Sequence, residues 1–232
     1  MTMKTIGLIG GMSWQSSAEY YRLINEGVHD RLGEHHSARL VLYSVDFQPI
    51  EEAQREARWD DTAAILGEAG AAVQRAGAEL LVLCTNTMHK VAAAIEEAAG
   101  IPLIHIADAT ARAIHRAGLT RVALLGTRFT MEDDFYRGRL EEHFGLEVLT
   151  PPETDRNEVH RIIYDELCHG QVLPESRQAY QRIIADLAGR GAGGVILGCT
   201  EIPMLIRPDD VAIPVFDTTR LHAEAAVDAA LG

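Results

Sequence analysis

Lysine is nearly absent from this chain of 232 residues, in which only Lys4 and Lys90 occur among 21 basic residues. Enzymes that use pyridoxal phosphate need a lysine to form the Schiff base with the cofactor. Lys4 precedes the first predicted strand, and Lys90 lies in a turn where a surface position is the more common role. The scarcity of lysine therefore argues against pyridoxal chemistry, and we expect no cofactor.

Cysteine is scarce as well. Cys84, Cys168 and Cys199 are too few and too far apart for a disulfide framework or a zinc site. An odd number of thiols suits a reducing compartment, so we expect no metal and a cytoplasmic protein. The start MTMKTIGLIGGM leads into SWQSSAEYY instead of a cleavage site, and it therefore predicts a first strand and not a signal peptide.

Long apolar runs and an excess of positive charge are also missing. No stretch approaches the roughly 18 consecutive apolar residues of a membrane span. Asp and Glu outnumber Lys and Arg by 34 to 21, for a net charge of −13. Such a chain is repelled by nucleic acid and by anionic membrane surfaces. A small anionic ligand is still compatible, because backbone N–H groups at helix starts can bind one. We expect a small molecule as partner.

Apolar runs rich in Ile, Val and Leu alternate with longer stretches of helical period, a pattern typical of an α/β fold with parallel sheets. Strands are predicted near 4–10, 39–45, 79–84, 102–106, 121–126, 146–149, 194–198 and 213–216. Helices are predicted over 15–31, 60–76, 87–99, 108–117, 131–144, 156–169, 175–190 and 218–231. The acidic stretch 51–61 is predicted to be mostly a solvated loop.

The chain repeats itself loosely. LLVLCTNTMH (80–89) is echoed by GVILGCTEIP (194–203), and TIGLIGGMS (5–13) by RVALLGTRFT (121–130). Each member of the first pair is an apolar run that ends in Cys-Thr. We therefore predict two pseudosymmetric Rossmann-like lobes, one of residues 1–106 plus 217–232 and the other of residues 107–216, with the active site in the cleft between them.

Polar residues follow the predicted strands at their carboxyl ends, where ligands bind in such folds. In GGMSW (10–14), Gly11 lets the backbone approach a ligand, and Met12 and Ser13 open a helix whose N–H groups suit a carboxylate or phosphate. The alternative is a tight turn that Ser13 caps.

The two Cys-Thr motifs carry further short donors. Asn86 and Thr87 follow one of them, and Thr200 and Glu201 belong to the other. Each set alone is explained as a helix cap. Their recurrence at equivalent places favours a ligand site. His89, one turn into a helix, is more often structural than catalytic, as are His105 and Cys168.

The motifs IGLIGGMSW, TNTMH, LLGTRFTM and GCTEIP resemble those of the pyridoxal-independent aspartate/glutamate racemase family, over essentially the whole chain. GCTE, where the cell-wall glutamate racemases have GCTH, favours the aspartate/glutamate branch, and the likeness is greatest to its enterobacterial-type members. The resemblance implies a two-lobed fold, usually a homodimer, in which two cysteines act as acid and base.

Three departures from the family pattern matter. When Asn86, Thr87 and His89 are aligned with the N-T-x-H of the family motif, Thr85, and not Cys84, takes the first catalytic position, opposite Cys199. Neighbouring strand residues point to opposite faces, so only one of the pair can face the cleft. Gln54, with Arg55 beside it, stands where aspartate-specific members carry an arginine. Cys168 stands in place of their lysine. The loss of both basic residues argues against strict aspartate specificity.

The resemblance implies a racemase of aspartate or glutamate that works without cofactor or metal. The GGMSW turn with Asn86, Thr87 and Thr200 would hold the substrate, as would Gln54, Glu201 and the motif threonine Thr130. Cys199 as thiolate would take the Cα proton from one face, provided that nearby donors lower its pKa. Thr85 would return a proton to the other face, directly or through water.

Two other functions remain open at this point. One is a related activity, such as that of a hydantoin racemase, maleate isomerase or arylmalonate decarboxylase. The other is a non-catalytic protein that binds small carboxylates. This alternative stays open because Thr85 stands where the family has a catalytic cysteine. A substrate panel and solvent deuterium uptake at Cα distinguish them.

Overall fold

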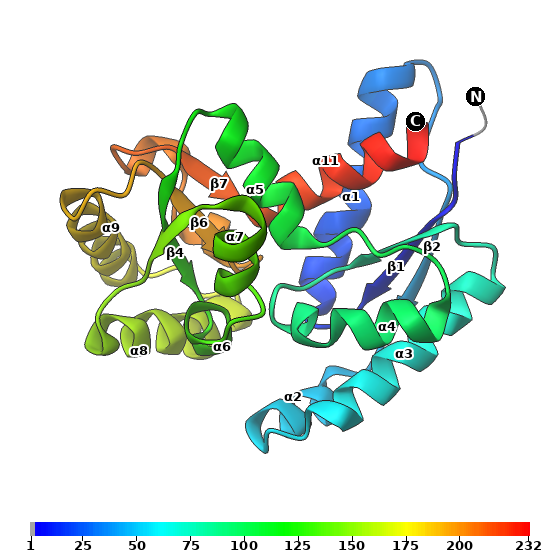
Figure 1. Cartoon of the computed structure of the whole chain (residues 1–232), viewed down its shortest axis with the longest axis horizontal. Helices are drawn as coiled ribbons and strands as arrows, with labels where there is room; N and C mark the ends of the chain where they lie inside the picture. The colour runs from blue at the N-terminus through cyan, green and yellow to red at the C-terminus, as the bar shows by residue number, and fades with distance from the viewer. Residues whose placement is uncertain (1–2) are drawn as a thin grey trace. The chain divides into compact units, whose positions relative to one another are not determined.

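Residues 3–232 are described in a computed structural model of the chain (Figure 1). The chain divides into two compact units, the first up to Ile106 with His222–Gly232 and the second Ala107–Leu221. The last helix is divided between the two units, since the second unit ends at Leu221 and the first resumes at His222. The first turn of the last helix is held in the second unit, because the Thr218 hydroxyl donates to the Leu197 carbonyl at 2.8 Å.

The first unit is built on a parallel sheet of order β2-β1-β3. Its elements are β1 (Ile6–Gly10), α1 (Trp14–Leu32), β2 (Leu40–Ser44), α2 (Phe47–Arg55), α3 (Trp59–Arg75), β3 (Leu80–Leu83), the 3₁₀ helix η1 (Thr87–Val91), α4 (Ala92–Ala99) and most of α11 (Thr218–Leu231). Helices α1 and α11 lie on one face of this sheet, and α3 and α4 lie on the other (Figure 1).

Strand residues of the first unit alternate between these two faces. Leu80 and Val82 of β3 pack against α1 and α11. Leu81 and Leu83 pack with residues of α3 and α4. The sheet is therefore buried on both faces, which explains why its strands are continuous apolar runs in the sequence.

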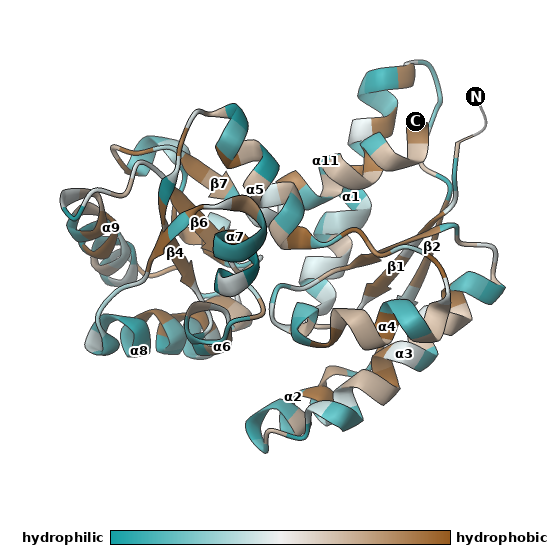
Figure 2. Ribbon diagram, viewed as in Figure 1, coloured by the Kyte–Doolittle hydropathy of each residue, from teal (hydrophilic) through white to brown (hydrophobic). Residues whose placement is uncertain are grey.

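The second unit has a parallel sheet of order β5-β4-β6-β7. Its elements are α5 (Ile106–Arg116), β4 (Arg121–Gly126), α6 (Arg128–Glu132), α7 (Arg137–Phe144), β5 (Glu147–Leu149), α8 (Glu153–Arg161), the π-helix η2 (Ile162–Glu166), the 3₁₀ helix η3 (Leu167–His169), α9 (Pro174–Gly189), β6 (Val195–Gly198), α10 (Ile202–Leu205), the 3₁₀ helix η4 (Pro208–Asp210) and β7 (Val215–Asp217). The α/β class with parallel sheets is confirmed. Strands β1, β4 and β6 are the hydrophobic centres of their sheets (Figure 2).

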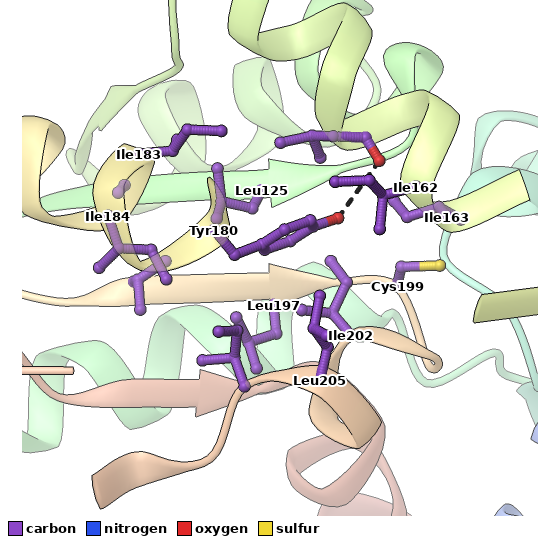
Figure 3. Packing of buried hydrophobic residues seen from close by; sticks show 14 of the residues in the cluster. Leu125, Ile162, Ile163, Tyr180, Ile183, Ile184, Leu197, Cys199, Ile202 and Leu205 are labelled. Atoms are coloured by element: carbon purple, nitrogen blue, oxygen red, sulfur yellow. Dashed lines mark hydrogen bonds between the residues drawn. The ribbon is translucent and has the colours of Figure 1, made fainter. Parts of the chain in front are cut away.

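One face of β4 and β6 packs against α8, η2 and α9. Leu125, Leu197 and Tyr180 lie in this cluster, and the Tyr180 hydroxyl donates to the Val159 carbonyl at 3.2 Å (Figure 3). Cys199 lies at the rim of the same cluster, with its sulfur directed away from the aliphatic side chains. Among the helices of residues 3–232, none is long and apolar enough to cross a membrane.

The prediction of a loop over 51–61 is wrong, because α2 and the start of α3 occupy most of it. The Asp46 side chain accepts the N–H of Gln48 and caps α2. Ile50, Ala53 and Gln54 then form one buried face at i, i+3 and i+4 spacing. Many charges on the outer face of this short helix concealed its period.

The prediction of a strand over 102–106 is also wrong. Only an isolated bridge joins Leu103 to Leu81, and α5 begins at Ile106. Histidine side chains form hydrogen bonds with backbone groups that would bond a neighbouring strand in a longer sheet. His222 bonds the Ile104 carbonyl at 2.7 Å, and His89 accepts the Ile106 N–H at 3.2 Å.

Two predicted helices are interrupted. That over 131–144 is split into α6 and α7, because Asp133 has extended backbone angles and Tyr136 is buried beside Thr110. That over 156–169 begins at Glu153 and passes through a π turn and a 3₁₀ turn to Gly170, whose φ is 72°. Such irregular turns change the direction of the residues that follow them.

Candidate active site

Cys84 and Thr85 follow β3 and lie in different surroundings. Cys84 continues the face of Leu80 and Val82, is fully buried, and belongs to the cluster with α1 and α11. Burial raises the pKa of its thiol far above the ordinary range. Thr85 lies beyond the end of the strand, is not a member of that cluster, and retains 8% exposure. The structure therefore buries Cys84 as a core residue.

Thr85 and Cys199 hold equivalent positions in the registers of their two separate sheets. The strands β1 and β4 both end at a glycine, Gly10 and Gly126. One residue earlier, Ile9 lies opposite Leu83 in the first sheet, and Leu125 lies opposite Leu197 in the second. Two residues beyond Leu83 is Thr85, and two beyond Leu197 is Cys199. As sequence, Cys84-Thr85 matches Cys199-Thr200. In the structural repeat, however, Thr85 corresponds to Cys199, which is a shift of one residue.

The glycine turn after β1 uses several of its polar groups internally. The Gly11 N–H donates to the Ser17 hydroxyl at 2.7 Å, and that hydroxyl donates to the Ser13 carbonyl at 3.0 Å. Ser13 caps α1 by accepting the Ser16 N–H at 3.3 Å. The Gly11 amide is therefore bonded within the turn, and an approach of a ligand to the Gly11 backbone stays a prediction.

Gly11→Ala is expected to destabilise the protein by more than about 3 kcal/mol, beyond the usual range for a point substitution. Gly11 has a φ of 99°, and an added Cβ would overlap the backbone carbonyl of Val45. Gly77→Ala is the matched control, because its φ of 100° is the same and no atom lies within 4 Å of an added Cβ. We expect that variant to lose only about 1–2 kcal/mol, from the positive φ. Urea unfolding of both variants measures the difference, and equal losses would contradict the steric explanation.

Gln54, and not Arg55, is the inward-facing residue of its pair. Gln54 is buried, and its side-chain amide lies 3.5 Å from the Met88 sulfur. Arg55 is exposed and pairs with Glu51 at 3.6 Å. Met12 packs in the same cluster as Met88. Gln54 therefore contacts Met88, which packs in one cluster with Met12.

Asn86 and Thr87 begin the 3₁₀ helix η1 directly after Thr85. Both side chains are nearly buried. Asn86 stands at the N-cap position in helical conformation without a side-chain capping bond. The N-cap explanation from the sequence therefore fails for Asn86.

Cys199, Thr200 and Glu201 form a compact polar group after β6. The Glu201 carboxylate oxygen Oε2 lies 2.9 Å from the Cys199 sulfur and 2.8 Å from the Thr200 hydroxyl. Cys199 is 9% exposed and Glu201 is 8% exposed. Both are thus at the margin of the core.

The thiol of Cys199 is held in its protonated form. Burial raises the pKa of Cys199 well above its ordinary value, and the charge of Glu201 adds to this effect. The N–H of Glu201 opposes it, but more weakly. The following helix α10 has only four residues. The expected thiolate is therefore not the resting form, and the thiol donates a hydrogen bond to the Glu201 carboxylate.

Cys168 lies near this group, and Thr130 packs beside Gly198, the residue directly before Cys199. The pKa of Cys168 is raised to about 12 by burial and secondarily by Glu201. The Thr130 side chain is fully buried, and its hydroxyl lies 3.2 Å from that of Thr127. Thr130 therefore supports the turn after β4, and its contact with substrate stays a prediction.

Histidines occupy the core behind Thr85. The His89 ring atom Nδ1 lies 2.8 Å from the Thr85 carbonyl, and Nε2 accepts the Ile106 N–H. The His105 ring lies edge-on to it, with ring centres 4.6 Å apart, and the His222 ring centre is 5.5 Å away. Burial, with these neighbouring imidazoles, holds the pKa of His89 well below its ordinary value. His89 is therefore a neutral, structural residue in this fold.

The free energy of unfolding is expected to decrease as the pH is lowered below about 6.5, the ordinary pKa of imidazole. Below that pH the unfolded chain binds a proton at His89, while the folded chain does not, because the folded pKa is lowered. The slope approaches about 1.4 kcal/mol per pH unit for such a group. Urea unfolding at several pH values tests this, with His89→Asn as the comparison. Parallel stability curves for the two proteins would contradict it.

The sequence analysis missed several residues that shape this region. Ser16 donates to the Cys84 carbonyl at 2.8 Å, and Ser17 accepts the Gly11 N–H. His222 accepts from the Tyr20 hydroxyl at 2.8 Å. The two serines stood in a helix with no signal beyond capping, and His222 lies 133 residues beyond His89 (222 − 89). Among residues 3–232, no group of three His, Cys, Asp or Glu is placed to hold a metal ion.

Comparison with known proteins places the chain in a family. Residues 9–226 match the model of the Asp/Glu/hydantoin racemase family. A Yersinia pestis crystal structure, provisionally assigned as an Asp/Glu racemase, is 55% identical, with a TM-score of 0.94 over 99% of this chain and 100% of that one. An aspartate racemase homologue from Pyrococcus horikoshii OT3 is 36% identical, with a TM-score of 0.87 and the same coverage.

A more distant structure shares the fold alone. The glutamate racemase of Francisella tularensis subsp. tularensis SCHU S4, in complex with D-glutamate, is 13% identical, with a TM-score of 0.65 over 99% of this chain and 81% of that one. It confirms the two-lobed α/β architecture predicted from the sequence. With the family model and the two nearer structures, the motifs GGMSW, TNTMH and GCTE have a common explanation: the chain belongs to the Asp/Glu/hydantoin racemase family and is an enzyme of the racemase class.

Proposed function

We propose that this enzyme racemises aspartate, glutamate or both, with Thr85 and Cys199 as the two proton-handling residues. One observation carries the assignment of these two: they occupy equivalent places in the registers of two parallel sheets, Thr85 just beyond the carboxyl end of the edge strand β3 and Cys199 just beyond that of the internal strand β6. The names of the related structures support an acidic amino acid as substrate.

The proposed reaction uses the two residues on opposite faces of Cα. For one direction, the Cys199 proton passes to Glu201, whose carboxylate is 2.9 Å from the sulfur, and the thiolate takes the Cα proton. Thr85 supplies a proton to the other face, directly or through water, and regains one from solvent. Glu201 releases its proton to solvent, so all three residues return to their starting states. A positioned acid or base contributes about 10²–10⁴-fold to a rate.

The substrate contacts in this proposal are Met12, Ser13, Gln54, Asn86, Thr87, Thr200 and Glu201. The polar side chains of Gln54, Asn86, Thr87 and Glu201 are buried, so they bind a ligand at low cost in lost side-chain entropy. The family resemblance further implies a homodimer, which light scattering of the purified protein tests.

Solvent exchange tests the proposal directly. Proton NMR of L- or D-glutamate and of L- or D-aspartate in D₂O is expected to show loss of the Cα proton signal when enzyme is added. A hydantoin racemase would instead exchange the ring proton of substituted hydantoins. If none of the four amino acids exchanges its Cα proton, the proposal is wrong. A non-catalytic binding protein would give that result.

Activity is expected to survive removal of metals and carbonyl cofactors. Of the two lysines, Lys4 is exposed, and Lys90 lies 4.0 Å over the ring of Trp59, where its ammonium is held by the aromatic face. Exhaustive EDTA and hydroxylamine treatment, followed by dialysis, should leave the exchange rate unchanged. Loss of activity with recovery on adding zinc or pyridoxal phosphate would contradict this.

A further inference from the structure

Three hydrogen bonds fix the backbone groups of Cys84 and Thr85. The Thr85 N–H donates to the Leu83 carbonyl at 2.8 Å. The Cys84 carbonyl accepts from the Ser16 hydroxyl, and the Thr85 carbonyl accepts from His89. A backbone fixed in this way leaves little freedom to the direction of its side chain.

Hydrogen bonds determine which nitrogen of His89 carries the proton. Nε2 accepts the Ile106 N–H, so it has no proton of its own in the neutral ring. The proton is therefore on Nδ1, 2.8 Å from the Thr85 carbonyl oxygen, which can only accept. The neutral ring links the end of β3 to the start of α5.

His222 makes a second bridge with the opposite tautomer. Its Nε2 faces the Ile104 carbonyl at 2.7 Å and must donate. Its Nδ1 then accepts from the Tyr20 hydroxyl. This bridge holds the segment before α5 against α1, and it makes no bond to Thr85.

We propose that His89 is a positioning residue for the reaction, which holds the Thr85 peptide through its Nδ1–H so that the threonine hydroxyl is aimed at the substrate. This inference rests on the proposed function. It assigns His89 no proton transfer to substrate, because both ring nitrogens already bond the backbone. A misplacement of about 1 Å can cost about 100-fold in rate, so the loss of this bond should be visible in kcat.

Three variants of His89 separate the bond to Thr85 from the rest of the side chain. Asparagine places an N–H donor near Nδ1, glutamine places its amide near Nε2, and alanine supplies neither. We expect His89→Ala and His89→Gln to lower kcat by about 10–100-fold with KM little changed, and His89→Asn to restore most of kcat. Tyr20→Phe is the matched control: it removes a buried hydrogen bond of the other bridge and should lower stability while leaving kcat near that of the unaltered enzyme.

A double-mutant cycle decides whether His89 acts through Thr85. In a Thr85→Ala background, His89→Ala should cause no further loss of kcat, since the hydroxyl it positions is gone. An additional loss equal to that in the unaltered enzyme would overturn the inference, as would a loss of kcat in Tyr20→Phe equal to that in His89→Ala.

A measurement without turnover keeps the inference testable if a variant does not fold. Nitrogen-15 NMR of the unaltered enzyme should show His89 as the neutral Nδ1–H tautomer between pH 6 and 8, and the Nε2–H tautomer would overturn the inference. If the unaltered enzyme exchanges no Cα proton of any acidic amino acid, the proposed function fails. If it does exchange and the His89 variants match it, only the positioning role fails.

Discussion

Cys199→Ser is expected to lower kcat by about 10²–10⁴-fold, the contribution of a positioned acid or base, or about 3–5.5 kcal/mol of barrier. A serine hydroxyl is a far weaker acid than the thiol, and it cannot pass its proton to Glu201 at neutral pH. The sulfur is directed away from the aliphatic cluster (Figure 3), so the fold should survive. Steady-state kinetics in both directions and the urea midpoint measure the two effects.

Cys168→Ser is the control for this experiment. Cys168 is half-buried, packs against the same cluster, and also lies in the field of Glu201. It carries no assigned proton transfer, so its variant should keep most of kcat. Equal losses at Cys168 and Cys199 would show that the roles are assigned wrongly.

Thr85→Ala is expected to lower kcat by a similar factor of about 10²–10⁴, whereas Cys84→Ala should leave it nearly unchanged. Cys84 is fully buried among residues of α1 and α11, so its truncation costs packing, about 1 kcal/mol of unfolding free energy. Kinetics and urea unfolding of the two variants separate catalysis from stability. Loss of racemisation in Cys84→Ala, with Thr85→Ala spared, would mean that Cys84 is the partner of Cys199.

Thr85→Cys tests the chemical inequality of the two faces. Two enantiomers in water have equal free energy, so kcat/KM must match in both directions, and inequality appears only in kcat and KM separately. A thiol at position 85 matches the acid on the other face. We expect kcat for the slower enantiomer to rise and the two kcat values to converge. A fall in both would count against the role of Thr85 as proton donor.

The parallel α/β fold was predictable because its strands are buried on both faces and therefore appear as continuous apolar runs between helical segments. Predictions failed where long-range contacts compete with local pattern. The segment 102–106 looks like a strand, but His89 and His222 take its backbone groups. The helix over 131–144 is divided where Tyr136 is buried.

The amino-acid sequence by itself determined the fold class, the family and the clustering of candidate residues at strand ends, because period, spacing and motifs are local properties. It left Cys84 and Thr85 as competing candidates, since a repeated Cys-Thr dipeptide matches in letters whichever residue faces the ligand. Only the tertiary structure decided which of them is core: pairing of β1 with β3 and of β4 with β6 sets the register, and a shift of one residue moves a side chain to the other face of the sheet. Likewise, the protonated state of Cys199 and the tautomer of His89 depend on burial and on partners that folding brings together, which no local pattern encodes.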